Sequence, residues 1–168
     1  MSAEVCAQCG RAVDAHNRQV RFTLPDPVLE TVRREYTEGT WMSHRDPQSS
    51  VMMQVPGIGA FVRALLPVQL DRGHSVTYGV WVAVHPDDLQ TIAAVWDAPE
   101  YADLVIDGIL ANKIPPWDLL AEPVHAIVRD RRHTPYIESS SHELFQRVLT
   151  ETWQHDVVLD PIEATLNP

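Results

Sequence analysis

The sequence predicts one α+β domain, in which a mostly antiparallel sheet is packed by a few helices, preceded by an N-terminal arm with a Cys-x-x-Cys pair. The 168 residues are the size of one ordinary domain, and 45% are hydrophobic, enough for a core without disulfides or metal. Apolar runs of strand length follow one another through the chain, separated by stretches with helical spacing. We therefore expect an arm over residues 1–24, a domain over 25–156 and a tail over 157–168.

The first part of the domain is expected to begin with a helix and to continue as strands. Asp26 caps a first turn and Pro27 fits the first helical position, so a helix should run to about Tyr36. Residues 38–50 contain Gly, Pro and Ser and predict a loop. Residues 51–55 and 60–70 predict two strands joined by a turn, and Pro67 indicates a bulge or an edge position.

The clearest strand is 76–85, joined to 60–70 by a hairpin-type connection at 71–74. Its side chains alternate, so Val80 and Val82 take one face and Trp81 takes the other. If the turn is centred on Gly73, paired positions sum to about 146, and Arg63 lies one diagonal step from Trp81 on the same face.

The second half of the chain mixes helices and short strands. Residues 86–96 have apolar positions at helical spacing, whereas residues 104–110 are compatible with a strand or a helix. Residues 124–129 and 135–138 predict two short strands. Ser140 and Glu143 form a capping-box pattern, which predicts a helix to about Gln154 and then a tail.

The charge of the chain disfavours two classes of partner. The net charge is −10 and the isoelectric point about 5.1, so most of the surface should repel a phosphate backbone and an anionic membrane. The N-terminus has no pattern of a signal peptide, and no apolar run approaches the length of a membrane span. We expect a cytoplasmic protein whose partner is a small molecule or another protein.

The Cys6-x-x-Cys9-Gly10 motif is the sharpest local pattern. A turn of this kind directs two thiolates to one point, which suits tetrahedral zinc. His16 is the nearest third ligand, and the candidates for a fourth are His44, His74 and His85. The alternative is a pair of free thiols on a loose arm.

A second group of candidates lies at apolar positions of the domain. Arg63 is within an apolar strand, where a charge requires a carboxylate partner or an opening that admits an anion. His125 lies on the strand face opposite its apolar neighbours, and His142 lies in the first turn of the last predicted helix. These three residues are candidates for catalysis, and Trp81 and Tyr78 are candidates for contacting a ligand. A shared concavity lined by Arg63, Trp81, His125 and His142 is expected; the alternative is that each has its own local partner.

Several segments together resemble the DUF2199 family of bacterial proteins. They are the N-terminal CxxCG, then FVR and LLPV, YGVWVA, GILANKIPPW, VH and PYIE with a later histidine, and they extend over roughly residues 6–150. The segment YGVWVA is similar to the family's W-G-V-W-V-S strand, and His125 and His142 match two of its histidines. The family is a domain of unknown function, so the resemblance implies a fold rather than an activity.

Two functions remain open from the sequence. The first is a zinc-containing binding or accessory protein, which the Cys-x-x-Cys pair and the lack of enzyme signatures favour. The second is a small-molecule enzyme with a pocket lined by His, Arg and Trp, which the polar residues at apolar positions favour.

Overall fold

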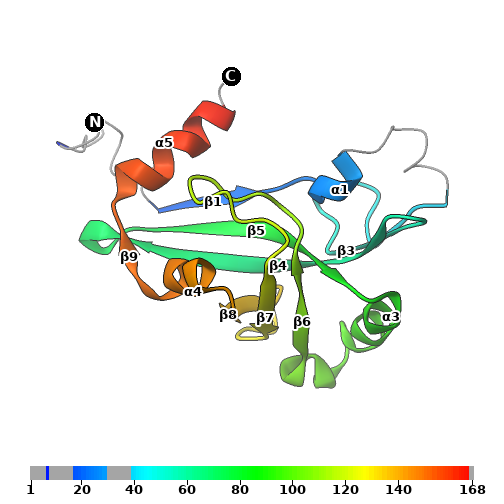
Figure 1. Cartoon of the computed structure of the whole chain (residues 1–168). Helices are drawn as coiled ribbons and strands as arrows, with labels where there is room; N and C mark the ends of the chain where they lie inside the picture. Colours follow the sequence, from blue (N-terminus) through cyan, green and yellow to red (C-terminus); the bar gives the residue numbers. More distant parts are fainter. Residues whose placement is uncertain (1–6, 8–16, 30–38, 167–168) are drawn as a thin grey trace, which may run out of the picture.

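The computed structural model describes residue 7, residues 17–29 and residues 39–166. Figure 1 shows the long strands β4 and β5 side by side across the molecule, with α3 at one end and α5 near the other. The strands are β1 (Asn17–Arg21), β2 (Trp41–Met42), β3 (Met52–Val55), β4 (Gly59–Leu70), β5 (Ser75–Val84), β6 (Val105–Leu110), β7 (Pro123–Ile127), β8 (Tyr136–Ser139) and β9 (Thr152–Trp153). The helices are α1 (Asp26–Leu29), α3 (Pro86–Val95), α4 (Glu143–Thr150) and α5 (His155–Leu166), with 3₁₀ turns η2 (Asp71–Gly73) and η3 (Pro99–Asp103).

The strands form one sheet that closes on itself. From β2 to β8, each strand pairs antiparallel with the next. The sequence predicts this order from residue 51 onward, but β2 lies within residues 38–50, which were expected to form a loop. The exception to antiparallel pairing is β8, which also pairs parallel with β4 through Leu65 and Tyr136, so that β4, β5, β6, β7 and β8 form a closed ring. Two further parallel pairings add β1 beside β5 and β9 beside β4. The α+β class is confirmed, and the parallel pairings of β1, β8 and β9 make the mostly antiparallel sheet a mixed one.

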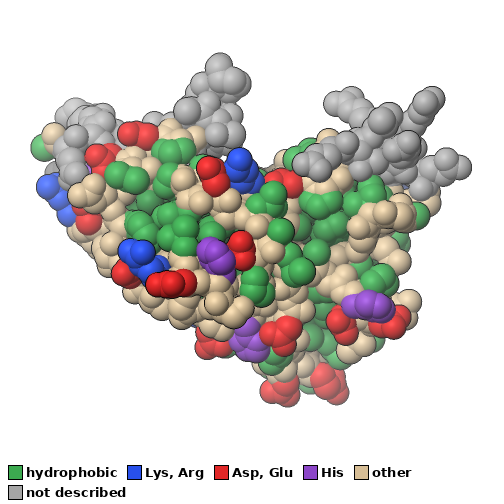
Figure 2. Space-filling view, in the orientation of Figure 1, with side chains coloured by type: hydrophobic (Ala, Val, Ile, Leu, Met, Phe, Trp, Pro, Cys, Tyr) green, Lys and Arg blue, Asp and Glu red, His purple; other side chains and the backbone are tan. Residues whose placement is uncertain are grey.

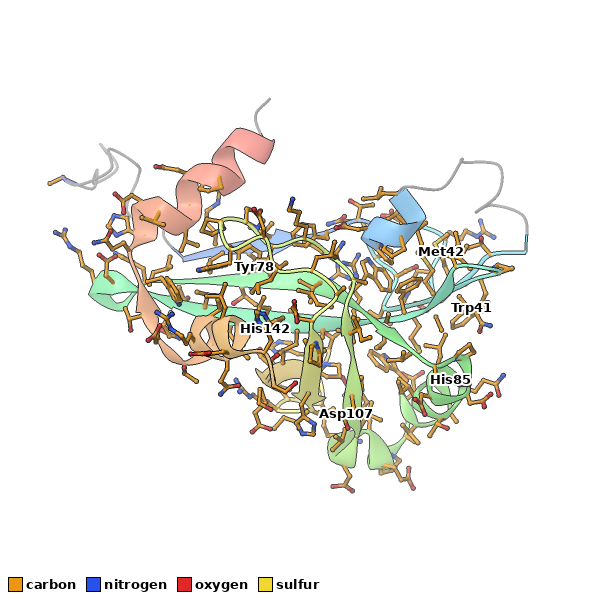
Figure 3. The ribbon with its side chains drawn as sticks, in the orientation of Figure 1. Trp41, Met42, Tyr78, His85, Asp107 and His142 are labelled. Atoms are coloured by element: carbon orange, nitrogen blue, oxygen red, sulfur yellow. The ribbon has the colours of Figure 1, made fainter. Side chains whose placement is uncertain are left out.

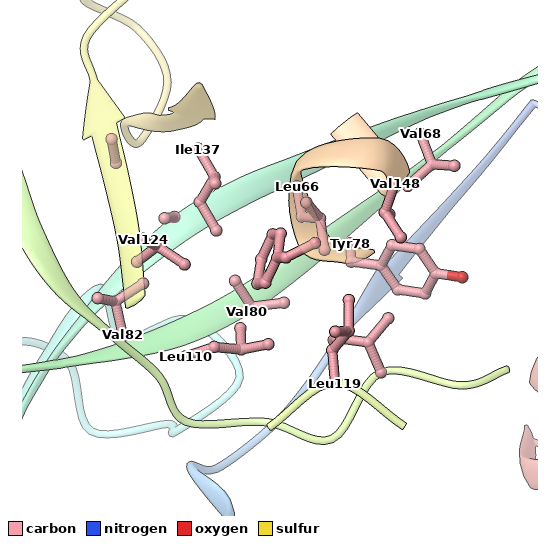
Figure 4. Packing of buried hydrophobic residues seen from close by; sticks show 14 of the residues in the cluster. Leu66, Val68, Tyr78, Val80, Val82, Leu110, Leu119, Val124, Ile137 and Val148 are labelled. Atoms are coloured by element: carbon pink, nitrogen blue, oxygen red, sulfur yellow. The ribbon is translucent and has the colours of Figure 1, made fainter. Parts of the chain in front are cut away.

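The main core fills the inside of this ring. Val80 and Val82 of β5 are fully buried, as predicted from the alternation of the strand. Figure 4 shows them packed with Leu110 and with Val124 and Ile137 from the opposite side. Three helices contribute buried residues to this core: Leu89 and Ile92 of α3, Phe145 and Val148 of α4, and Val158 and Leu159 of α5.

The register of the β4–β5 pair differs from the sequence prediction. Arg63 lies directly opposite Trp81 and not opposite Ala83. The reason is the turn, because Arg72 has a φ of 61° and shares the reversal with Gly73, which moves the centre of the hairpin by one residue. Arg63 and Trp81 are therefore a direct cross-strand pair on one face.

The parts of the chain near its two ends, and the helix boundaries, also differ from the sequence prediction. Residues 17–21, expected in the arm, form β1, and residues 155–166, expected largely as a tail, form α5. The predicted capping box at Ser140 is wrong, because His142 caps α4. The helix also ends earlier than expected, at Thr150. The helix expected over 26–36 is described only for Asp26–Leu29, and its remainder lies outside the described residues.

Candidate functional site

A row of polar side chains crosses the outer face of β6, β7 and β8. Asp107 of β6 lies opposite His125 of β7, and His125 lies opposite Ser139 of β8. Their neighbours Ile106 and Val124 point inward and are buried, so the alternation of the strands places the row outside the ring. Figure 3 labels Asp107 on β6, which carries one end of the row.

Two carboxylates flank the imidazole of His125. The Asp107 Oδ1 is 2.7 Å from His125 Nδ1, and the Glu138 Oε2 is 4.0 Å from His125 Nε2. A carboxylate at Nδ1 fixes the proton there, so in the neutral ring Nε2 carries a lone pair. His125 therefore presents a hydrogen-bond acceptor, and a site for a proton, to the surface beside Glu138.

Asp107 and His125 line an open pocket of about 440 Å³. Its described lining contains no Lys or Arg, and it consists of Asp107, Pro123, Val124, His125 and Ser139–Ser141. In Figure 2 the histidines of the visible face lie against acidic side chains. The pocket thus offers oxygen and nitrogen acceptors, with hydroxyl groups at its rim.

His142 follows directly on the serines of this pocket and has a structural task. Its Nδ1 accepts a hydrogen bond from the backbone N–H of Phe145 at 3.3 Å, which caps α4. Because Nδ1 is the acceptor, the ring proton of the neutral form is on Nε2, which lies 3.6 Å from Glu122 Oε1. The sequence places His142 in the first turn, and the structure places it one residue before that turn.

Arg63 is fully buried, and its partners are backbone carbonyl groups rather than a carboxylate. Its Nε donates to the oxygen of Ser50 at 3.0 Å, one terminal nitrogen donates to those of Phe22 and Gly79, and the other to those of Thr23 and Pro47. The prediction of a carboxylate partner for Arg63 is therefore wrong, as far as the described residues go. Burial, and then the charge of Arg21, lower the pKa of Arg63 to about 9, so the group is a cation at neutral pH.

Trp81 and Tyr78 are also fully buried. The indole of Trp81 lies 4.2 Å from the Arg63 guanidinium, and its Nε1 donates to the Thr23 oxygen. Tyr78 stacks on Phe22 and its hydroxyl is 3.5 Å from the oxygen of Pro115; burial raises its pKa. None of these aromatic and guanidinium groups reaches the surface.

The candidates therefore separate into two groups. His125 and His142 lie on or beside the same outer surface, whereas Arg63 and Trp81 point outward from β4 and β5 into a second buried cluster. Sequence reasoning missed Asp107 and Glu138, the partners of His125. The only signal for Asp107 was a charged residue within the apolar run 104–110.

Cys6, Cys9 and His16, the residues of the predicted zinc site, lie outside the described residues. In the described ranges, no group of three or more His, Cys, Asp or Glu residues has the geometry to hold a metal ion. Nor does this part of the chain contain a helix of the length and apolarity needed to cross a membrane.

The fold and the polar surface define a small α+β domain with a carboxylate–histidine pocket on the outside of its sheet. The chain belongs to the family described as an uncharacterised protein conserved in bacteria, DUF2199, whose sequence profile matches residues 5–150. This match confirms the resemblance found in the sequence. No curated protein and no solved structure matches the chain.

Proposed function

We propose that this protein binds a small ligand with a primary amino group, and that the ligand occupies the pocket around His125. The observation that carries the proposal is the 2.7 Å contact between Asp107 Oδ1 and His125 Nδ1 on the wall of that pocket. It orients the ring and leaves Nε2 as an acceptor that faces solvent.

The geometry beside His125 suits an ammonium group. His125 Nε2 and Glu138 Oε2 are 4.0 Å apart, so one nitrogen about 2.9 Å from each can donate hydrogen bonds to both. Asp107 on the lining and Glu138 beside His125 favour a positive charge, and the described lining offers no cation that would repel it. Ser139–Ser141 can bind further polar groups of the same molecule.

The proposal is tested by titrating ¹⁵N-labelled protein with ethanolamine and recording amide shifts. We expect saturable shifts confined to the residues that line the pocket, lost in His125→Ala and in Asp107→Asn. His133→Ala, which removes a histidine from another pocket, is the matched control and should bind like the native chain. Uniform shifts, or shifts that persist in both pocket variants, would refute the proposal.

The Asp107–His125 contact also favours an enzyme as a second candidate. A histidine held by a carboxylate is suited to take a proton from a bound hydroxyl or amine through Nε2. If the protein is such an enzyme, Arg63 and Trp81 support its fold and do not line its pocket, because both are fully buried. Catalysis predicts that Asp107→Asn lowers kcat more than it raises KM, whereas simple binding predicts only weaker affinity.

For the N-terminal arm we propose a zinc site formed by Cys6, Cys9 and His16. The spacing of the two cysteines supports it. Asn17, the first residue of β1, pairs with Ser75, so the arm joins the sheet next to His74, the best placed candidate for a fourth ligand. His85 directly follows β5 and is eleven residues after His74, about 36 Å away at about 3.3 Å per residue.

Elemental analysis of untagged protein tests the zinc site. One zinc per chain is expected in the native protein, and its loss in a Cys6→Ser/Cys9→Ser variant that stays folded, because the domain has its own core. Traces of zinc that the double substitution leaves unchanged would refute the site.

A further inference from the structure

A second pocket, of about 170 Å³, lies between the end of α3 and the loop that joins β7 to β8. Its volume corresponds to about six water molecules at the liquid density. One wall comes from Trp96 and Asp97, which follow α3, and from Tyr101 of η3. A second wall comes from residues 131–134 of the loop, and Val51 completes the lining.

The two walls carry opposite charges, and these charges do not form an ion pair with each other. Arg132 has its own partner, Asp130, at 2.9 Å, which lowers the pKa of that carboxyl to about 2. Arg131 and Asp97 have no hydrogen-bond or ion-pair partner among the residues that the structure describes. One small pocket therefore has a cation, Arg131, and a carboxylate, Asp97, in its lining, and neither has a partner in the part of the chain that the structure describes.

The two walls are held together, and the wall that carries Asp97 also offers an apolar surface. The Tyr101 hydroxyl donates a hydrogen bond to the backbone oxygen of His133, which ties η3 to the charged loop. The rings of Trp96 and Tyr101 are 5.0 Å apart between centroids, and Tyr101 is almost fully buried. A bound molecule would meet an exposed charge from each wall and an aromatic surface for its apolar part.

We infer that this pocket binds a small zwitterion, a free amino acid with an apolar side chain. The carboxylate pairs with Arg131, the ammonium group pairs with Asp97, and the side chain packs against Trp96 and Val51. A simple anion is repelled by Asp97 and a simple cation by Arg131, so only a molecule with both charges uses both walls. The inference is independent of the pocket around His125.

The test compares L-leucine with two molecules that each lack one of its charges, in NMR titrations of the full ¹⁵N-labelled chain. These are 4-methylpentanoate, without the ammonium group, and isoamylamine, without the carboxylate. Leucine is expected to give saturable shifts of the Trp96 indole and of the 131–134 amides, at about millimolar concentration. Each single-charge analogue should bind about tenfold more weakly or not at all.

Variants of the two exposed charges complete the test. Arg131→Ala and Asp97→Asn should each weaken leucine binding about tenfold. Arg45→Ala and Glu100→Gln remove exposed charges outside the pocket and should leave it unchanged. The inference is overturned if leucine gives no saturable shift, if 4-methylpentanoate binds as well as leucine, or if both pocket variants bind like the native chain.

Discussion

Arg63 is expected to be one of the largest single contributors to stability. Its five N–H groups all donate to backbone carbonyls, of which those of Phe22, Pro47 and Ser50 are closest. The five acceptors belong to three segments of the chain, residues 22–23, residues 47–50 and Gly79. Arg63→Ala removes a donor from each of them; Thr23, Ser50 and Gly79 keep a second donor, in Trp81, Arg21 and Phe22 respectively, whereas no other donor to the Phe22 and Pro47 oxygens is found among the described residues. The substitution also leaves a cavity against the face of Trp81.

The expected loss of unfolding free energy follows from these hydrogen bonds. A hydrogen bond from a charged donor contributes about 1.5–3 kcal/mol, so the three closest bonds exceed about 4 kcal/mol before any offset. Removing the guanidinium also removes the free energy spent on its dehydration, several kcal/mol for a buried ion. We expect a net loss of about 3–5 kcal/mol, a large part of the 5–15 kcal/mol typical of a whole domain.

Urea unfolding followed by tryptophan fluorescence measures this loss. Arg63→Lys keeps the charge but has only three donors, so it should lose about 2–3 kcal/mol. Arg45→Ala, at an exposed site, should be neutral. If Arg63→Ala unfolds within about 1 kcal/mol of the native chain, the carbonyl cluster does not hold these segments together, and the reasoning is refuted.

Three further predictions concern the sheet, a helix cap and an ion pair. Gly108→Ala places a methyl group 2.5 Å from the oxygen of Ala83, so thermal unfolding should show a loss of about 1–3 kcal/mol, and an unchanged Tm would contradict this contact. His142→Ala removes the cap of α4 and should cost about 1 kcal/mol, whereas His142→Asn, which restores a capping acceptor, should recover most of it; equal losses would argue against capping. Burial raises the pKa of Asp71, but hydrogen bonds from His155 outweigh it and leave the pKa lowered, so the carboxylate stabilises the fold at neutral pH and this contribution disappears as the pH falls below about 4. Asp71→Asn should therefore destabilise the protein most at pH 7 and progressively less as the pH falls below about 4, and an effect of equal size over the whole range would contradict the assignment.

Much of the sheet was already determined by the sequence. The alternation of residues 76–85 was enough to place Val80 and Val82 in the core and Trp81 on the other face. The alternation of residues 124–129 likewise predicted that His125 turns away from Val124 and Ala126, which are buried. Periodicity succeeds here because it records which side of a segment is removed from water.

What surrounds each of these residues was decided only by the tertiary structure. The ring closes through a parallel pairing at Leu65 and Tyr136, and β1 adds to β5, neither of which leaves a local trace. Arg63 finds its acceptors up to 41 residues away, and His125 meets Asp107 across 18 residues of sequence. Local patterns report the burial of a segment, but they do not report which distant segment supplies its hydrogen bonds. The carboxylate expected beside Arg63 was therefore wrong, and the one beside His125 was missed.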